Sequence, residues 1–397
     1  MASFEFDPFS FRLHEDPYPV YARLRDEAPL YRNEQHGFWI LSRYADCKRA
    51  VSDVLTYSSA AGISLEVMSE QLPMVITMDP PSHSRLRHKL SGIFTPTAVA
   101  PLEDHIRALA RGYLGRHLAA GRIDIVKDFS AYLPMAIIRH LIGWPKEDDD
   151  RLRSLFDHIQ ERGEDDHVQA PESAAAAQRE VFAYMEQRIA ERRAGASADD
   201  LLGYFLKLED EGALTHEEVL GQLNLLTLAG NETTTKLIGN MAYRLWQNPD
   251  GRALIARDRS LIPSAIEETL RFDGPSQMVA RTLTRDVTLY GRTMRAGDKV
   301  GILFISGNRD ERHYRDPERY DVTRNPRDHL GFGYGLHACL GAALARLETR
   351  IVFEEILGAM PNFEIDEAAI VYQHSPHVRG FKSVPATFAP RKTAGRQ

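Results

Sequence analysis

The chain has 397 residues, of which 43% are hydrophobic and 26% are charged, which is ordinary for a globular protein. A net charge of −7 argues against a nucleic-acid-binding surface, and two cysteines exclude a disulfide scaffold and fit a reducing cytoplasm. Residues 1–31 carry charges throughout and contain no apolar run of about 18 residues, so we expect neither a signal peptide nor a membrane anchor. No linker-like segment divides the chain, and we expect one cytoplasmic domain over residues 1–397.

Helical patterns dominate the sequence, and strand-like patterns are few. Hydrophobic periodicity predicts helices over residues 19–28, 45–52, 99–119, 132–142, 172–193, 219–246 and 261–271. Alternating patterns bounded by turn residues predict strands over residues 38–42, 287–290, 293–295 and 299–304. Residues 58–76 are loop-like, and residues 147–198 are charged and alanine-rich. The sequence therefore predicts a mainly α fold with a small β-rich region.

The longest helical pattern, over residues 219–246, has clear signals at both ends. Thr215 and Glu218 form a capping-box signature before it, and Asn248 with Pro249 ends it. Roughly 30 residues at a rise of about 1.5 Å give a helix of about 45 Å, which is long enough to cross a domain.

The middle of this long helix contains a poor helix former followed by threonines. Gly230 costs about 1 kcal/mol relative to alanine in a helix interior. The Thr233 hydroxyl is placed to bond the carbonyl of Ala229 one turn back, which bends a helix and opens a groove. The alternative is a harmless irregularity with threonines that face solvent.

Cys339 lies in the stretch 332–341, Phe-Gly-Tyr-Gly-Leu-His-Ala-Cys-Leu-Gly, which contains three glycines and precedes an apolar helical run. Glycines let backbone N–H groups approach the sulfur, and a helix start favours a thiolate. The other cysteine, Cys47, is far away in sequence, so no C-x-x-C pair exists for zinc, an iron–sulfur cluster or c-type haem. The remaining readings are a nucleophile, a single axial ligand to haem iron, or a buried inert thiol in a glycine-rich turn.

The stretch around Cys339 resembles the haem-binding loop of the cytochrome P-450 family, whose pattern F-G-x-G-x-H-x-C-x-G it matches at every fixed position. Three further stretches resemble the same family in the family's order, so that the resemblance covers nearly the whole chain. The resemblance implies a mainly α fold that encloses haem b between the long helix and the cysteine loop. It also implies that Cys339 is the thiolate ligand of the iron.

Glu268-Thr269-Leu270-Arg271 fits the family's E-x-x-R motif. The resemblance makes Glu268 and Arg271 a buried ion pair that supports the haem loop and does no chemistry. An arginine from a later segment is expected to complete it. We expect Arg319, with Arg324 as the alternative.

Residues 229–234, Ala-Gly-Asn-Glu-Thr-Thr, resemble the family's oxygen-binding groove. The resemblance assigns Ala229 and Gly230 to the haem and oxygen site. It assigns Thr233 to oxygen activation and Glu232 to proton relay, as the acid–alcohol pair in the middle of the helix.

Residues 79–87, Asp-Pro-Pro-Ser-His-Ser-Arg-Leu-Arg, resemble an early helix of bacterial members of the family. There a histidine and an arginine reach the haem propionates, and His83 and Arg87 fall on the matching positions. Arg281 and His337 match two further propionate ligands. Arginine suits this task because its guanidinium fits a carboxylate bidentately.

The substrate pocket is the part of the site for which the resemblance is least specific. By family position it includes Leu225, Leu228, Gln277, Val279, His377 and Val378, with Ala229 beside them and Ile63, Leu65 and Met68 as its roof. In the family, residues 58–76 and 147–198 correspond to segments that cover the substrate entrance, although both also fit simple solvated connections. A largely apolar pocket with few polar groups suits a steroid, terpenoid, fatty acid, macrolide or aromatic compound.

The function implied is a haem-thiolate monooxygenase that uses O2 and hydroxylates or epoxidises a hydrophobic small molecule. We expect a monomer that receives electrons from a separate ferredoxin and ferredoxin reductase, docked near Arg85, Lys89 and Arg346. Nucleic acid is not an expected partner. The alternatives are a haem-thiolate binding or sensing protein, which would not need Glu232 and Thr233, and a peroxide-using or isomerising haem-thiolate enzyme. A cysteine-nucleophile hydrolase fits less well because no acid is placed to orient His337.

Overall fold

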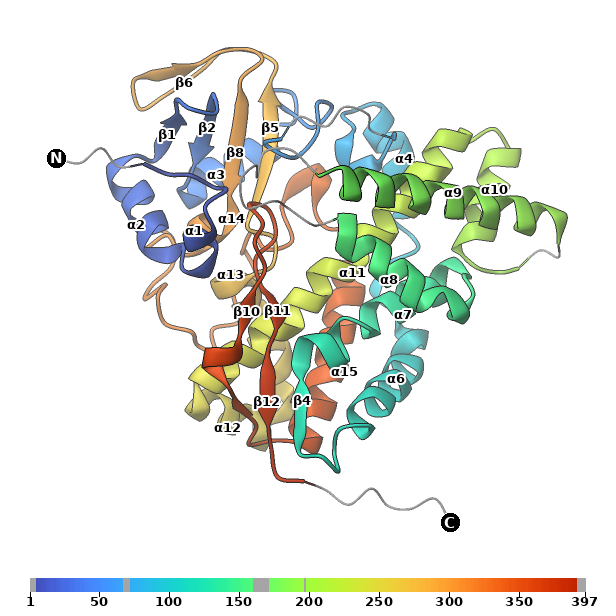
Figure 1. Cartoon of the computed structure of the whole chain (residues 1–397). Helices are drawn as coiled ribbons and strands as arrows, with labels where there is room; N and C mark the ends of the chain where they lie inside the picture. The colour runs from blue at the N-terminus through green and yellow to red at the C-terminus, as the bar shows by residue number, and fades with distance from the viewer. Residues whose placement is uncertain (1–4, 67–71, 160–170, 196–197, 391–397) are drawn as a thin grey trace.

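Helices make up most of the structure, a computed structural model described for residues 5–66, 72–159, 171–195 and 198–390 (Figure 1). The helices are α1 (Phe11–Glu15), α2 (Tyr18–Glu27), α3 (Tyr44–Ser52), α4 (Ser82–Leu90), α5 (Pro96–Val99), α6 (Glu103–Gly115), α7 (Leu133–Ile142), α8 (Asp149–Ile159), α9 (Glu172–Ala194), α10 (Leu201–Asp210), α11 (His216–Gln247), α12 (Pro249–Arg257), α13 (Ile262–Asp273), α14 (Phe304–Asn308) and α15 (Ala342–Ala359). The strands are β1 (Leu30–Asn33), β2 (Phe38–Leu41), β3 (Tyr57–Ser58), β4 (Arg122–Asp124), β5 (Met278–Leu283), β6 (Val287–Leu289), β7 (Arg292–Met294), β8 (Lys299–Leu303), β9 (Glu364–Ile365), β10 (Val371–Tyr372), β11 (Phe381–Ser383) and β12 (Pro385–Thr387).

The main sheet has the strand order β1-β2-β8-β5-β3 and lies on one side of the molecule, away from helices α6 to α10 (Figure 1). Strand β2 shows why the sheet forms. Its successive side chains point to opposite faces of the sheet, and an apolar cluster covers each face. Trp39 and Leu41 belong to one apolar cluster, and Phe38 and Ile40 to another. The sheet therefore sits between two cores, and its strand β5 carries residues 278–283 to the centre of the molecule.

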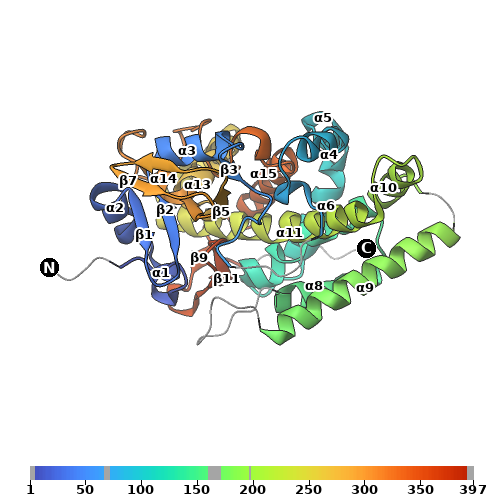
Figure 2. The ribbon, with the colours of Figure 1, turned by 90° about the horizontal axis from the view of Figure 1, so that it is seen from above.

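Helix α11 crosses the length of the molecule (Figure 2). The Thr215 side chain accepts a hydrogen bond from the N–H of Glu218, and the Glu218 side chain accepts one from the N–H of Thr215, as the sequence predicted. The helix is assigned without interruption from His216 to Gln247, through the Ala229–Gly230 step. It packs against α7, α13 and α15, so that it lies in the middle of the helical part of the molecule.

The predicted elements agree with the structure for every strand and for six of the seven helices, within a few residues at their ends. The helix predicted over residues 99–119 is broken into α5, a short 3-10 turn at Ala100–Leu102, and α6. Pro101 lies in that turn and has no N–H, which prevents a continuous i to i−4 ladder there. Residues 147–198 contain the two helices α8 and α9 in addition to segments outside the described residues. Among the described residues, no helix is long and apolar enough to cross a membrane.

Candidate active site

A cavity of about 260 Å³ lies between the middle of α11 and the loop that carries Cys339. Strand β5, helix α4 and the start of α15 complete its walls. The sequence-predicted residues that line it are His83, Arg87, Leu225, Ala229, Gly230, Thr233, Val279, Arg281, His337 and Cys339, together with Ile63 from the predicted roof. Residues more than 250 positions apart in the chain therefore share one cavity.

The loop before α15 turns the Cys339 thiol into this cavity. Gly333 and Gly335 have φ angles of 67° and 71°, a left-handed conformation that glycine adopts without cost. The Cys339 N–H donates to the Phe332 carbonyl at 2.8 Å, which closes the loop. Burial raises the pKa of the thiol, while the Gly341 N–H and the nearby Arg87 act in the opposite direction. A bound cation would be needed to hold the thiolate fully, since metal ligation deprotonates a thiol outright.

Cys339 is suited to be a single protein ligand. The described residues contain no group of three or more histidine, cysteine and carboxylate side chains that would hold a metal ion. The other cysteine, Cys47, is buried in α3, and burial raises its pKa well above the usual range. These observations leave axial ligation to a large cofactor as the metal chemistry that fits.

Four side chains that can donate hydrogen bonds to an anion face the cavity without a carboxylate partner among the described residues, and we call them the cavity donors: His83, Arg87, Arg281 and His337. Arg281 is 4% exposed, and its guanidinium donates to the neighbouring Ala280 carbonyl. Neither arginine forms an ion pair with any described residue, and both ring nitrogens of buried His83 lack a partner.

The electrostatics of the cavity donors favour an anionic ligand. Burial lowers the pKa of Arg281 to about 10. Burial, together with Arg281 and His83, lowers the pKa of His337 to about 3, and burial also lowers the pKa of His83, so that neutral imidazole rings are favoured at both positions. A buried positive charge without a partner is costly, and an anionic ligand would offset that cost. The two carboxylates of haem fit this donor set, with Cys339 to reach the iron.

The α11 wall of the cavity contains the predicted groove residues. Thr233 Oγ1 donates to the Ala229 carbonyl at 2.8 Å, as predicted from the sequence. A Cβ atom added at Gly230 would lie 2.7 Å from the Ile138 side chain of α7, so the glycine allows close packing there. Glu232 does not line the cavity, because its carboxylate pairs with Lys236 at 3.0 Å on another side of the helix.

Behind the cysteine loop, Glu268, Arg271 and Arg324 form a buried ion cluster. Arg271 binds Glu268 bidentately, with nitrogen–oxygen distances of 2.7 and 2.8 Å, and both side chains are 0% exposed. Arg324 Nε approaches the same carboxylate at 3.2 Å. The preference for Arg319 is therefore wrong and the alternative Arg324 is correct.

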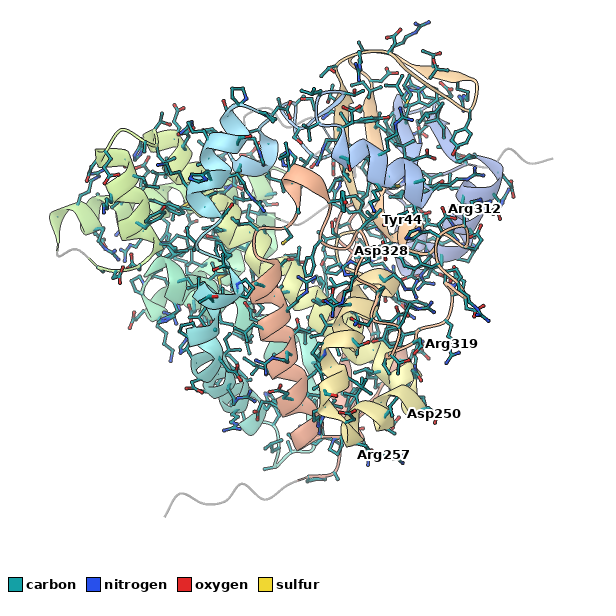
Figure 3. All side chains as sticks on the ribbon, turned by 180° about the vertical axis from the view of Figure 1, so that it is seen from behind. Tyr44, Asp250, Arg257, Arg312, Arg319 and Asp328 are labelled. Carbon is teal, nitrogen blue, oxygen red and sulfur yellow. The ribbon has the colours of Figure 1, made fainter. Side chains whose placement is uncertain are left out.

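Arg319 points outward from the molecule (Figure 3). Its side chain is 73% exposed and lies 3.7 Å from Asp321, and only its backbone carbonyl accepts a bond from Arg271. Arg324 takes the place next to Glu268 because its guanidinium also donates hydrogen bonds to the carbonyls of Arg315 and Asp316, which hold it over the turn. The sequence could not distinguish the two arginines, since they lie within a few residues of each other in the same segment.

Glu267 is a supporting residue that the sequence analysis missed. Its carboxylate binds Arg346 of α15 at 2.6 Å and His329 at 2.9 Å, so it joins the two ends of the cysteine loop. Burial would raise its pKa, but the bonds from Arg346 and His329 outweigh this effect and lower the pKa to about 2. Its place immediately before the E-x-x-R motif was the available signal.

Glu348 of α15 also lines the cavity and was not predicted. It is 1% exposed, and its Oε2 atom has no hydrogen-bond partner. Burial raises its pKa well above the usual range, so its surroundings favour the neutral acid.

Several residues predicted for the substrate pocket do not line the cavity. Gln277 donates to the Pro376 carbonyl at 3.2 Å, and His377 binds Glu66 at 2.6 Å, so neither polar group faces inward. Leu228 and Val378 also lie outside the lining, Leu65 packs beside the sheet, and Met68 lies outside the described residues. Apolar residues that periodicity alone did not single out take their place: Ile76, Phe94, Ile138 and Leu226.

Known proteins match this chain over nearly its whole length. Residues 169–368 match the cytochrome P450 family. Cytochrome P450 123 of Mycobacterium tuberculosis is 41% identical over 392 residues, which cover 97% of each protein. The vitamin D(3) 25-hydroxylase of Pseudonocardia autotrophica is 35% identical over 399 residues, with the same coverage of 97% on both sides. The structure of CYP109E1 from Bacillus megaterium in complex with testosterone is 30% identical and matches with a TM-score of 0.89, over 96% of this chain and 99% of that one. The chain therefore belongs to the cytochrome P450 family of haem-thiolate monooxygenases, which use dioxygen and electrons from a redox partner.

Proposed function

We propose that the chain inserts one oxygen atom of O2 into a hydrophobic small molecule, by hydroxylation or epoxidation. Haem b is the proposed cofactor, and a separate ferredoxin with its ferredoxin reductase is the proposed electron source. The proposed enzyme is a monomeric, cytoplasmic protein of one domain. The family supports the reaction class, and the residues around the cavity support the assignments that follow.

One observation carries the proposal: the Cys339 thiol and the Thr233 hydroxyl line the same cavity from different elements, and the cavity donors line it too. Cys339 would hold the iron, and Arg87, Arg281 and the two histidines would hold the propionates. When bound, haem supplies dioxygen activation, which a thiolate ligand promotes by donating electron density.

The remaining work falls to the chain itself. Thr233 keeps its hydroxyl at the cavity through its bond to the Ala229 carbonyl, and it can pass a proton to a group bound there. Glu232, the preceding residue on α11, is half-buried and can exchange protons with solvent. Residues 72–75 are held over α11 by Gln222, which bonds the backbone of Pro73 and Val75 and so helps to keep water out.

The lining favours a large and mostly apolar substrate. Aliphatic and aromatic side chains from separate segments of the chain surround the space: Ile63, Ile76, Phe94, Ile138, Leu225 and Val279. Vitamin D(3) and testosterone, which appear in the names of two proteins compared above, are molecules of this kind. We propose a steroid-like or other extended hydrocarbon substrate, with few polar groups to orient it.

The test is turnover under heavy-isotope dioxygen with a substrate chosen by its effect on the haem spectrum. One labelled oxygen atom in the product supports the proposal. A ligand that binds without any turnover would instead favour a sensing protein, and product formed only with added peroxide would favour a peroxide-using enzyme.

Thr233→Ala tests the role of the hydroxyl. The variant should bind haem and substrate normally but release hydrogen peroxide in place of product. The reason is that the Thr233 hydroxyl no longer passes protons to the group bound in the cavity. Thr227→Ala is the matched control, since Thr227 also bonds a carbonyl one turn back, that of Leu223, but does not line the cavity. Normal coupling in Thr233→Ala would remove this residue from the mechanism.

A further inference from the structure

Lys236 is a buried lysine in the middle of the longest helix. It is 4% exposed, and its ammonium has two acceptors: Glu232 Oε1 at 3.0 Å and the Phe381 carbonyl of β11 at 3.0 Å. Lysine is almost never this buried unless it is paired. The place of Lys236 therefore depends on these two contacts.

The surrounding chain is shaped to admit this lysine. Gly380 lies so close to it that an added Cβ atom would be 2.7 Å from Lys236 Cβ. The Phe381 carbonyl that follows reaches the ammonium. On the next turn of α11, Asn240 bonds the Arg379 carbonyl at 3.3 Å, so the C-terminal turn is held along this side of the helix.

Stability alone does not explain the pair. Replacing a buried ion pair by apolar residues of similar volume is often neutral or stabilising, because desolvation of both charges offsets their attraction. The pair also fixes the orientation of the Glu232 carboxylate, which lies on the side of α11 that faces Phe381. Glu232 directly precedes Thr233 in the chain. Without this contact, a glutamate in a helix samples several rotamers.

We propose that Lys236 is a positioning residue that holds the Glu232 carboxylate outside the cavity, between solvent and the Thr233 hydroxyl. In each cycle the Glu232 carboxylate takes one proton from solvent and then passes it toward Thr233, so the carboxylate is regenerated. Lys236 keeps the carboxylate oriented between deliveries. This inference rests on the proposed role of Glu232 and Thr233 and extends that role to a residue outside the cavity.

A mutant cycle on the haem-loaded enzyme tests the inference. Lys236→Met, Glu232→Gln and the double variant are compared for product formed per reductant consumed and for the solvent deuterium isotope effect on turnover. Lys236→Met should lower coupling several-fold and raise the isotope effect. The double variant should be no worse than Glu232→Gln alone, because Lys236 acts through Glu232.

Lys236→Arg and Lys207→Met are the controls. Lys236→Arg keeps the charge and should restore most of the coupling. Lys207→Met removes a lysine from an exposed i,i+4 pair with Glu211, at 4.0 Å, and should leave coupling unchanged. Wild-type coupling in Lys236→Met would overturn the inference, and so would a double variant whose loss equals the product of the two single losses.

Urea unfolding of the same haem-loaded variants gives a readout independent of turnover. In this unfolding cycle, Lys236 and Glu232 should show a favourable interaction free energy. Midpoint shifts that simply add would contradict a stabilising contact between the two side chains. Should Lys236→Met fail to fold, Lys236→Gln replaces it in both cycles, since the amide can still donate to the Phe381 carbonyl without carrying charge. Normal coupling in Glu232→Gln would refute the relay role itself, which Thr233→Ala tests separately.

Discussion

The buried ion cluster behind the cysteine loop and the cavity donors in front of it differ in whether their charged groups are paired. In the ion cluster, every charged group has a partner within the chain: Glu268 accepts bonds from Arg271, from Arg324 and from the backbone of Asp321. Among the cavity donors, Arg281 is nearly as buried, yet no carboxylate of the described chain pairs with it. The first region is complete in itself, and the second is complete only with an anionic ligand.

This contrast separates support from function. A saturated cluster fixes the loop that presents Cys339, and its loss should harm the protein whether or not a ligand is bound. Unpaired donors cost stability until a ligand binds, so their loss should harm binding far more than folding. The predictions below test this distinction, beginning with the largest effect.

Glu268→Gln should cause the largest loss. It leaves Arg271 buried without its charge partner, which costs about 3–5 kcal/mol. We expect a large fall in the urea unfolding midpoint and fast haem loss to a scavenger. Glu103→Gln, which affects a partly exposed network with Arg107 and Arg350, should cost no more than about 1 kcal/mol. Equal effects of the two substitutions would contradict a special role for the buried cluster.

Arg281→Met should weaken haem binding with little harm to the rest of the fold. Loss of a hydrogen bond between charged groups costs about 1.5–3 kcal/mol, or roughly tenfold to a hundredfold in affinity. Haem titration of the variant measures this loss. Arg285→Met, two residues beyond the end of β5 and 68% exposed, is the control and should bind haem normally. A variant that unfolds as readily as Glu268→Gln would place Arg281 among the supporting residues.

Glu267→Gln should change the acid sensitivity of the protein. The pKa of Glu267 is lowered from 4.5 to about 2, so the carboxylate stabilises the fold fully above about pH 5, and this contribution is lost as the pH falls toward 2. The variant should be less stable at neutral pH and should lose less stability on acidification. Unfolding curves at several pH values measure this difference, and parallel pH profiles would argue against it.

Reduction by a ferredoxin should show the smallest effect, a modest weakening with salt, because exposed charges are screened over about 8 Å at physiological ionic strength. Of the three proposed docking cations, Arg85 binds Glu218 and Arg346 binds Glu267, so reversing either also disturbs the fold. Lys89→Glu is therefore the cleanest variant, measured as the reduction rate across a salt series. A rate that neither salt nor Lys89→Glu changes would place docking elsewhere.

The sequence predicted much of the fold and the centre of the site because those parts depend on local signals. The capping box at Thr215 and Glu218 marked the start of α11 correctly. The Cys339 loop carries its own glycines, two of which have the left-handed conformation that the loop needs. The resemblance to a known family then brought distant segments together, which periodicity alone could not do.

The parts that the sequence did not predict depend on long-range packing. Arg324 and Arg319 follow the same motif, and only the path of the turn decides which side chain reaches Glu268. His377 was expected in the pocket, but Glu66, more than 300 residues away, holds its ring. In the sequence, Lys236 is an ordinary polar residue of a long helix. Its buried position follows from β11, which lies beside it and whose Phe381 carbonyl accepts its hydrogen bond.

The most direct test of the central claim is the absorption spectrum of the reduced enzyme with carbon monoxide. Thiolate ligation by Cys339 predicts a strongly red-shifted Soret band, which should disappear in Cys339→Ser and persist in Cys47→Ser, since Cys47 is buried in α3 away from the cavity. A histidine-type spectrum in the wild-type protein, or a red-shifted band that survives Cys339→Ser, would contradict the account.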